Sequence, residues 1–257
     1  MIAIKSEKEI EIMRRGCKAL AEIMAEIEKA IAPGKNTLEL DKLAEELILI
    51  RGGKPAFKNY GAESGRPFPA TICSSVNDEI VHGIPNEKII IKEGDIFKVD
   101  IGMIYEGYFS DMARSFAVGK ISSKAQKLIE VTEQCFWEGL KNLRDGGKLS
   151  DYSKAVQKFV EKNGFSVVRN LVGHGIGKNL HEDPCIPNFW NRSQKEENVK
   201  KGMTFALEPM VNIGGLETIL GNDGWVYKTS DGSLSAHYEN TVLITNGEPE
   251  VLTIVDK

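Results

Sequence analysis

Cysteine is scarce in this sequence, and long apolar runs are missing. The four cysteines show no C-x-x-C spacing, so they are expected to be reduced thiols rather than a disulfide framework. No apolar stretch approaches the roughly 18 residues that cross a bilayer, and the first residues lack the apolar core of a signal peptide. The sequence therefore predicts a cytoplasmic protein with no membrane partner. The cysteines are Cys17, Cys73, Cys135 and Cys185.

An excess of one charge is also lacking. The 33 lysines and arginines nearly balance the 37 aspartates and glutamates, which gives a net charge of −4, and no long basic run occurs. Nucleic acid is therefore not expected as a partner. Hydrophobic residues make up 41% and charged residues 27%, an ordinary balance for a globular protein. A chain of 257 residues can bury a core without disulfide bonds.

The first part of the chain predicts two helices followed by strands. Ser6 and Glu9 form a capping box, and apolar residues then recur at steps of three and four as far as residue 31, which predicts one long helix. Pro33 and Gly34 end it. A second helix, capped by Thr37, is predicted to end at residues 52–53. Period-two patterns predict strands over 70–74, 89–91, 96–104 and 108–118.

The same order of elements returns in the second part. Helices are predicted over 122–143 and from a cap at Ser150 to residue 164, and strand-like segments follow at 165–172, 203–213 and 238–245. An offset of 112 places Leu40 on Tyr152 and Gly52 on Gly164. The repeat predicts a single catalytic domain, residues 1–257, with an α+β fold of two similar halves, approximately 1–119 and 120–257. A ligand site is expected at the seam.

Two aspartates interrupt neighbouring apolar strands. Glu106 and Gly107 make a good two-residue hairpin turn. With that turn, Asp100 faces residue 113 and Asp111 becomes its diagonal neighbour on the same sheet face. Two like charges on one face are unfavourable unless they are paired. They could be exposed or paired with Lys98 or Arg114, or a bound cation could lie between them.

Further isolated acids and the four histidines favour the cation. Glu208 and Glu239 stand alone in apolar, strand-like runs, and a glycine lies next to His174. Carboxylates and a histidine on strands of both halves are typical of a carboxylate-rich two-metal site. The helical zinc-protease motif H-E-x-x-H is absent. The histidines are His82, His174, His181 and His237.

In the order and spacing of these residues, the chain resembles the type I methionine aminopeptidases, which have the pita-bread aminopeptidase/creatinase fold of two pseudo-symmetric halves around a central metal site. The resemblance covers essentially the whole chain, and its most specific stretches are 76–85, 100–114, 173–189 and 205–209. It implies that two divalent ions (Co, Mn, Fe, Zn or Ni) are held by Asp100, Asp111, His174, Glu208 and Glu239. Asp111 and Glu239 would bridge them.

The resemblance also implies a mechanism. A bridging metal hydroxide would attack the scissile carbonyl, with Glu208 as general base. His181 would stabilise the carbonyl oxygen, and His82 would contact the scissile amide nitrogen. The implied reaction removes the initiator methionine when the second residue is small. His237 shares a strand face with Glu239, and because the family fills its site without it, we expect it on the rim or behind the ligands.

The side-chain pocket is placed by the same resemblance. Cys73 and Trp225 match a pocket cysteine and tryptophan, and Tyr60 and Phe68 are expected as further walls. Residues 63–67 lengthen the nearby loop relative to typical bacterial relatives, and Leu180 stands where an aromatic residue is common. These departures concern the shape of the pocket.

The resemblance implies nascent polypeptide N-termini as partners. A contact with the ribosome exit region would suit that substrate. The protein is expected to be a monomer. Three other hypotheses stay open at this point. The chain could be a proline-specific aminopeptidase of the same fold, a non-catalytic binding protein of that fold, or an unrelated carboxylate phosphoesterase.

Overall fold

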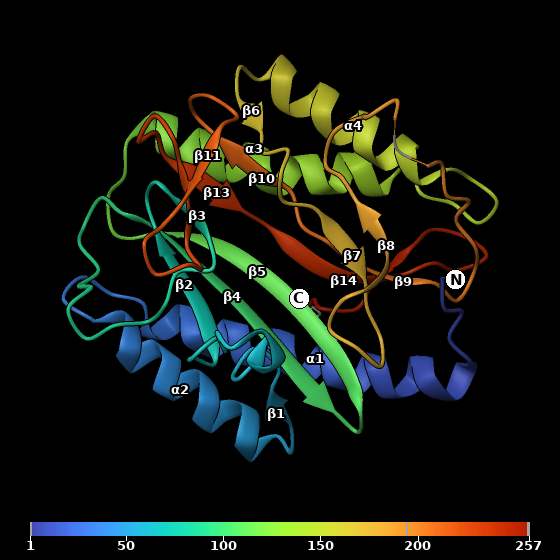
Figure 1. The fold of residues 1–257 in the computed structure, drawn as a ribbon, viewed down its shortest axis with the longest axis horizontal. Coiled ribbons are helices and arrows are strands. Elements are labelled where there is room, and N and C mark those ends of the chain that lie inside the picture. The colour runs from blue at the N-terminus through green and yellow to red at the C-terminus, as the bar shows by residue number, and fades with distance from the viewer. Residues whose placement is uncertain (1, 194, 256–257) are drawn as a thin grey trace.

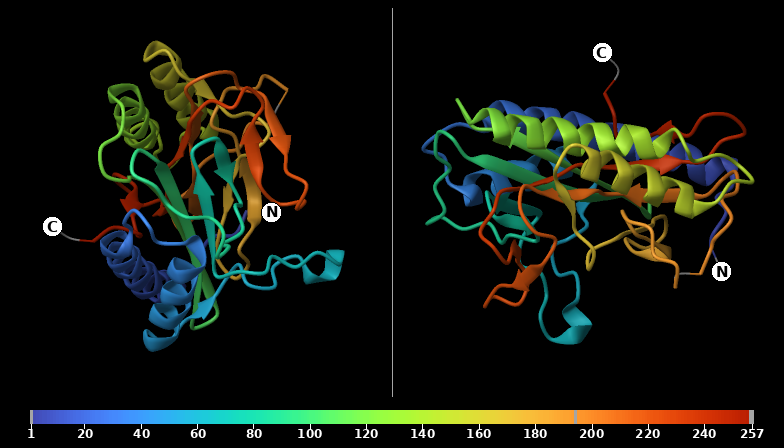
Figure 2. Two further views of the ribbon diagram at one scale, coloured as in Figure 1. Left: turned by 90° about the vertical axis from the view of Figure 1, so that its left-hand side faces the viewer. Right: turned by 90° about the horizontal axis from the view of Figure 1, so that it is seen from above.

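Four α-helices cover one face of a central sheet, and loops cover the other face (Figure 1; Figure 2, right). The structure, a computed structural model, describes residues 2–193 and 195–255. Within this part of the chain no helix is long and apolar enough to span a membrane. The helices are α1 (Glu7–Ala30), α2 (Thr37–Ile50), α3 (Ser123–Leu140) and α4 (Leu149–Lys162).

The helix starts test the predicted caps. The capping box of Ser6 and Glu9 is confirmed. Thr37 is wrong as the cap of α2, because Asn36 Oδ1 accepts the Glu39 amide at 2.9 Å and Thr37 is already helical. Ser150 is wrong as the cap of α4 for the same reason: the helix begins at Leu149, and the Ser150 hydroxyl donates to Glu196 at 2.7 Å.

The central sheet has nine strands and takes them from both parts of the chain. Its main path runs in the order β1-β4-β5-β14-β9-β7-β8, with β2 paired to β4 and β15 paired to β14. Because β5 of the first half pairs with β14 of the second half within this one sheet, we propose that the halves form one domain. The strands are β1 (Lys54–Pro55), β2 (Ile72–Val76), β4 (Ile96–Tyr105), β5 (Tyr108–Ala117), β7 (Gly173–Gly175), β8 (Glu182–Ile186), β9 (Thr204–Leu207), β14 (Glu239–Leu243) and β15 (Glu250–Val251).

The β4–β5 hairpin has the predicted register. Glu106 and Gly107 both adopt positive φ, 47° and 84°, as a type I′ turn requires. Residue 105 pairs with 108, and Asp100 pairs with Ala113. The two strands are ten residues long and cross the middle of the molecule (Figure 1), so side chains along one face of this hairpin point toward the seam between the halves.

Two small sheets complete the fold. One has the order β13-β10-β6 and the other β11-β12-β3. Their strands are β3 (Glu79–Val81), β6 (Ser166–Val167), β10 (Met210–Asn212), β11 (Thr218–Leu220), β12 (Tyr227–Thr229) and β13 (Ser235–His237).

Three predicted strands need correction. Residues 89–91 form only an isolated bridge between Ile90 and Asn36. Only residues 166–167 of the segment 165–172 are strand. The segment 203–213 is broken at Glu208 and Pro209 into β9 and β10, which belong to different sheets, because proline has no amide to continue a ladder.

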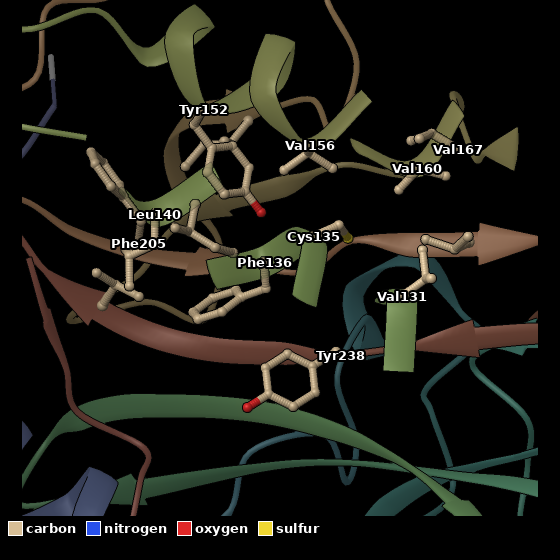
Figure 3. Packing of buried hydrophobic residues seen from close by; sticks show 14 of the residues in the cluster. Val131, Cys135, Phe136, Leu140, Tyr152, Val156, Val160, Val167, Phe205 and Tyr238 are labelled. Atoms are coloured by element: carbon tan, nitrogen blue, oxygen red, sulfur yellow. The ribbon is translucent and has the colours of Figure 1, made fainter. Parts of the chain in front are cut away.

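The largest core cluster lies between α3, α4 and the sheet (Figure 3). Phe136 and Tyr152 are fully buried, and each large apolar side chain moved out of water contributes about 1.5–3 kcal/mol before its ordering cost. Gly139 allows the close approach of the helices, since a Cβ there would lie 2.6 Å from Tyr152 and Val156. This packing holds the helices against one face of the sheet, so a site for chemistry is left on the opposite, loop-covered face.

On that opposite face the longer loop projects away from the body (Figure 2, left, cyan). It contains a short 3₁₀ turn, η1 (Ala62–Ser64), flanked by Gly61 and Gly65 in the left-handed conformation. Its base is closed by two backbone hydrogen bonds, from Asn59 N to Phe68 O and from Phe68 N to Tyr60 O, both 2.8 Å. Tyr60 and Phe68 are therefore fixed at the base whatever the tip does.

Candidate metal centre

A cavity of about 110 Å³ lies on the loop-covered face of the central sheet. Acidic side chains line its floor, and aromatic and aliphatic side chains form its wall. The cavity brings together every residue predicted for the metal site and the substrate pocket. Its lining consists of Phe57, Tyr60, Phe68, Cys73, His82, Asp100, Asp111, His174, Leu180, His181, Glu208, Trp225 and Glu239.

The β4–β5 hairpin supplies two of the acids. Asp100 pairs with Ala113, and Asp111 pairs with Gly102, so the two carboxylates are diagonal neighbours on one face, close enough for a hydrogen bond between them. Burial raises the pKa of Asp100 to about 7. Burial and then the charge of Asp100 raise the pKa of Asp111 well above its ordinary value.

Adjacent strands bring the remaining donors beside this pair. Glu239 opens β14 and pairs with Ala113, and Glu208 directly follows β9. His174 on β7 pairs with Ala206 of β9. Its Nε2 lies 3.5 Å from Glu208 Oε1. Burial, before all other causes, raises the pKa of both glutamates well above the usual range.

The orientation of His174 suits metal binding. Its Nδ1 hydrogen donates to the Gly175 carbonyl at 2.8 Å, because a carbonyl can only accept. The proton is therefore on Nδ1, and the Nε2 lone pair faces the carboxylates. This is the usual arrangement for a histidine ligand, in which the second nitrogen is held by a hydrogen bond. Burial lowers the pKa of His174 to about 3, which keeps the imidazole neutral.

The buried polar atoms of this cluster fit divalent cations. Asp100 Oδ1, Asp111 Oδ1 and Glu239 Oε1 are buried and have no hydrogen-bond partner among the described residues. One oxygen each from Asp111 and Glu239 and a nitrogen of His174 lie within 4.8 Å of one another. Buried carboxylates that lack donors are costly unless cations compensate them, and oxygen donors with one imidazole suit a transition-metal ion.

The two basic residues considered as partners for the aspartates are directed elsewhere. The buried ammonium of Lys98 donates to the backbone carbonyls of Asn77 and Ser235, both at 3.0 Å. The Arg114 guanidinium donates to the carbonyls of Ala113 and Glu239 and to Asn240 Oδ1. These bonds tie the backbone around the site together, so neither of these two cations is paired with the aspartates.

Two histidines line the cavity above the acids. His82 follows β3 with a φ of 60°, and its ring meets the edges of Trp225 and Tyr227. The His181 ring centroid lies 4.2 Å from that of His174. Burial lowers the pKa of His82 to about 4 and lowers the pKa of His181 as well, so both imidazoles are neutral near pH 7 and can donate one hydrogen bond each.

The apolar wall of the cavity includes Phe68, Cys73 and Trp225. Phe68 and Trp225 meet edge to face at 5.2 Å between ring centroids, and Cys73 pairs with Asp100 across β2 and β4, which places the thiol at the boundary between floor and wall. Sequence reasoning missed Phe57. It has no motif of its own and follows the two-residue strand β1, so only the pairing of β1 with β4 brings it to the cavity.

His237 does not lie on the rim, and that part of the expectation is wrong. The side chain is only 1% exposed, and its Nε2 lies 3.9 Å from Glu208 Oε2 and 3.8 Å from Glu239 Oε2. Burial, followed by the nearby charges, lowers its pKa to about 3. The strand parity with Glu239 gave the side of the strand on which His237 lies but not the depth of its side chain.

Comparison with known proteins identifies the family to which this chain is similar. Metallopeptidase family M24 matches residues 11–246. The chain is 46% identical over 256 residues to a methionine aminopeptidase of Clostridium acetobutylicum, with 100% of both chains covered. The crystal structure of methionine aminopeptidase from Thermotoga maritima is 41% identical and has a TM-score of 0.94, covering 99% of this chain and 100% of that chain.

A more distant structure extends the comparison to the fold alone. Prolidase from Pyrococcus furiosus is 23% identical with a TM-score of 0.79, and covers 99% of this chain and 66% of that chain. The α+β pita-bread fold expected from the sequence is confirmed by these similarities.

Proposed function

Because this chain belongs to metallopeptidase family M24 and, within it, to the methionine aminopeptidases, we propose that it removes the initiator methionine from newly made proteins whose second residue is small. It is a metal-dependent hydrolase by this relationship. The observation that carries the proposal is one cavity in which four carboxylates, two of them buried and two half-buried, face an apolar, aromatic wall.

Five residues would hold two divalent ions. Asp100 would bind the first ion, His174 and Glu208 the second, and Asp111 and Glu239 both. The four carboxylates supply a charge of −4, which two divalent ions balance. When bound, such ions lower the pKa of a water toward about 7 and polarise a carbonyl oxygen. Cobalt, manganese, iron, zinc and nickel all suit these donors.

Glu208 is proposed as the general base. Its carboxylate sits at the floor of the cavity, and its backbone carbonyl is held by Asn188 Nδ2 at 3.1 Å. The following Pro209 restricts the chain where it leaves β9. The carboxylate would accept a proton from the attacking water and return it to the departing amine. A base held by two strands and a proline keeps one position through both transfers.

The two cavity histidines are proposed to act on the substrate. His181 would donate a hydrogen bond to the scissile carbonyl oxygen as negative charge develops. Its Nδ1 lies 2.7 Å from Tyr60 Oη, which fixes the ring. His82 would contact the scissile amide nitrogen, and its neighbour Gly83 approaches the Ser74 carbonyl so closely that a Cβ would lie 2.1 Å from it. That contact pins the loop carrying His82.

The apolar wall is proposed to select methionine. Cys73, Phe68, Trp225 and Tyr60 would surround the side chain, with Phe57 as an additional contact. A thioether is flexible and polarizable and contacts aromatic rings favourably. Discrimination against a side chain one methylene smaller should be about 10–200-fold, the usual range for apolar pockets. Crowding near His82 would limit the second residue to small side chains.

The cellular setting follows from the substrate. We propose that the enzyme acts in the cytoplasm on nascent chains, where the ribosome exit region presents free N-termini. All the residues proposed for the site belong to this chain, and we propose that it acts as a monomer. The amine of the substrate would meet the acidic floor, which explains why only a chain end is accepted.

One assay tests the function. Purified protein loaded with cobalt should release methionine from Met-Ala-Ser and leave a Xaa-Pro dipeptide and an aryl phosphate intact. Cleavage of the Xaa-Pro peptide in preference to the methionyl peptide would replace the proposal with a proline-specific activity. Phosphatase turnover would assign the carboxylates to a different reaction, and no turnover on any substrate would favour a binding protein.

A further inference from the structure

His237 is held in a fixed orientation at the junction of two sheets. It is the last residue of β13, and Glu239 is the first residue of β14, so one residue separates them and both side chains point to the same side. The backbone of His237 is anchored on both sides: its amide donates to Ser115 Oγ at 2.9 Å, and the Ser115 hydroxyl donates to its carbonyl at 2.8 Å. These bonds fix the backbone, and because the residue is only 1% exposed, the surrounding packing leaves the imidazole little freedom.

The Nε2 atom of this imidazole is buried and has no hydrogen-bond partner among residues 2–193 and 195–255. The nearest carboxylate oxygens, on Glu239 and Glu208, are 3.8 and 3.9 Å away. These separations exceed the limit of a hydrogen bond. They match two donors that share an ion, because donors each about 2.1 Å from one metal stand about 3–4 Å apart.

A second set of donors surrounds this nitrogen. Ligand atoms of Asp100, His237 and Glu239 all lie within 4.8 Å of one another. The other such group is formed by Asp111, His174 and Glu239, and the two groups share only Glu239. Asp100 Oδ1 and Glu239 Oε1 are themselves without hydrogen-bond partners in the described chain. These five residues thus form two overlapping groups of three, which share Glu239 and contain one imidazole each.

We propose that His237 is a sixth protein ligand of the metal centre and binds the first ion together with Asp100 and Glu239. This inference rests on the two-ion centre proposed above. Each ion would then have one nitrogen donor. A neutral imidazole adds no charge, so the balance between four carboxylates and two divalent ions is unchanged. An added nitrogen donor favours Fe²⁺, Co²⁺ or Zn²⁺ over Mn²⁺ or Mg²⁺ at the first position.

The alternative role is a hydrogen bond from His237 to Glu208 or Glu239 that only orients these carboxylates. Both roles would lower metal affinity on substitution, since residues behind the ligands commonly change it by about 10–100-fold. Affinity alone does not distinguish the two roles. The number of imidazoles bound to metal distinguishes a ligand from a residue that only orients the carboxylates.

The test uses the full chain stripped of metal and loaded with two equivalents of Co²⁺. Proton NMR of the paramagnetic protein with labelled histidine should show two hyperfine-shifted imidazoles in the wild type and one in His237→Gln. The affinity for the tighter ion should fall at least about 10-fold in that variant. His82→Gln, which changes a half-buried histidine of the cavity outside the two donor groups, is the matched control and should keep both shifted imidazoles.

The outcomes are distinct. A wild type that binds two cobalt ions and cleaves Met-Ala-Ser but shows one shifted imidazole overturns the role of His237 and leaves the proposed function intact. A wild-type protein that fails to bind cobalt overturns both the role of His237 and the proposed function. The count in the wild type does not depend on whether the variant folds, and His237→Asn provides a second substitution in which the shifted signal should also be lost.

Discussion

The hydroxyl of Tyr60 lies 2.7 Å from Nδ1 of His181, and the two rings are 5.2 Å apart between centroids. When the hydroxyl donates to Nδ1, the imidazole proton resides on Nε2. That tautomer can donate a hydrogen bond to a substrate oxygen. A residue at the base of the projecting loop thereby sets the hydrogen-bonding direction of a residue at the reaction centre.

Removing this hydroxyl should slow the reaction modestly. Tyr60→Phe keeps an aromatic wall but leaves Nδ1 without its partner, so kcat should fall about 3–10-fold, the scale of one lost hydrogen bond of about 1 kcal/mol. The measurement is steady-state hydrolysis of Met-Ala-Ser. Tyr105→Phe, on the face that packs against α1, is the matched control and should not change the rate. Equal rates for wild type and Tyr60→Phe would show that the hydroxyl does not orient His181.

Truncating His181 should cost far more. His181→Ala removes the donor to the developing oxyanion, and kcat should fall about 10²–10³-fold, while both metal ions remain bound by elemental analysis. Because Tyr60 acts through His181, the double variant should be no slower than His181→Ala alone. A loss of metal in His181→Ala would contradict its assignment to the substrate.

Removing the metal should lower thermal stability. A ligand at a thousand times its dissociation constant stabilises the folded state by about 4 kcal/mol, and each kcal/mol shifts the Tm of a chain this long by about 2–4 °C. A chelator should therefore reduce the wild-type Tm by about 8–16 °C in calorimetry. Asp111→Asn should show almost no such difference, whereas the exposed Glu87→Gln should behave as the wild type. A full metal-dependent gain in Asp111→Asn would remove Asp111 from the ligand set.

The preference for methionine should depend on Trp225. Trp225→Ala opens the wall that faces Phe68, so kcat/KM for Met-Ala should fall and the ratio of Met-Ala to Leu-Ala should approach one, a change of about 10-fold or more. Trp190→Ala, at an exposed position outside the cavity, serves as the control. An unchanged ratio in Trp225→Ala would place the side-chain pocket elsewhere.

Asp41 should make stability depend on pH. Its buried carboxylate accepts the amides of Thr71 and Ile72 at 2.8 and 3.0 Å, yet burial outweighs these bonds and raises its pKa. A folded-state pKa above the unfolded value means that the folded state binds the proton more tightly. Stability from this group is complete below the unfolded pKa of about 4 and decreases as the pH rises through the folded pKa.

Asp41→Asn should remove this effect. The amide oxygen can accept the same two hydrogen bonds without a charge, so the Tm of the variant minus that of the wild type should be more positive at pH 7 than at pH 4. Measuring both proteins at both pH values cancels the contribution of all other groups. A difference that is the same at the two pH values would show that Asp41 carries no buried charge penalty.

Local signals in the sequence predicted the long elements well. The capping box at Ser6 and the turn at Glu106 and Gly107 each determine a structure within a few residues, and both are present. Strands of three residues such as β7 and β12 carry no alternating pattern long enough to read. Their pairing depends on neighbours distant in sequence, and the break at Pro209 became clear only from the two sheets it separates.

The floor of the site was more predictable than its wall. An isolated acid in an apolar strand, such as Asp100 or Glu239, is conspicuous because burying it requires compensation. A phenylalanine such as Phe57 is ordinary in any core, so its place at the cavity could not be inferred. The depth of His237 depends on how β10 pairs with β13, which is a tertiary contact that strand parity does not include.

The closed base of the projecting loop makes its tip a place where the protein can change without cost to the reaction. Because backbone hydrogen bonds join Asn59, Tyr60 and Phe68 below it, residues added or removed at the tip, 62–65, should leave the spacing of Tyr60 and Phe68 unchanged. Such a site can accept length variation during evolution. It can equally accept a grafted peptide tag for immobilisation, with the anchored enzyme still facing its substrates.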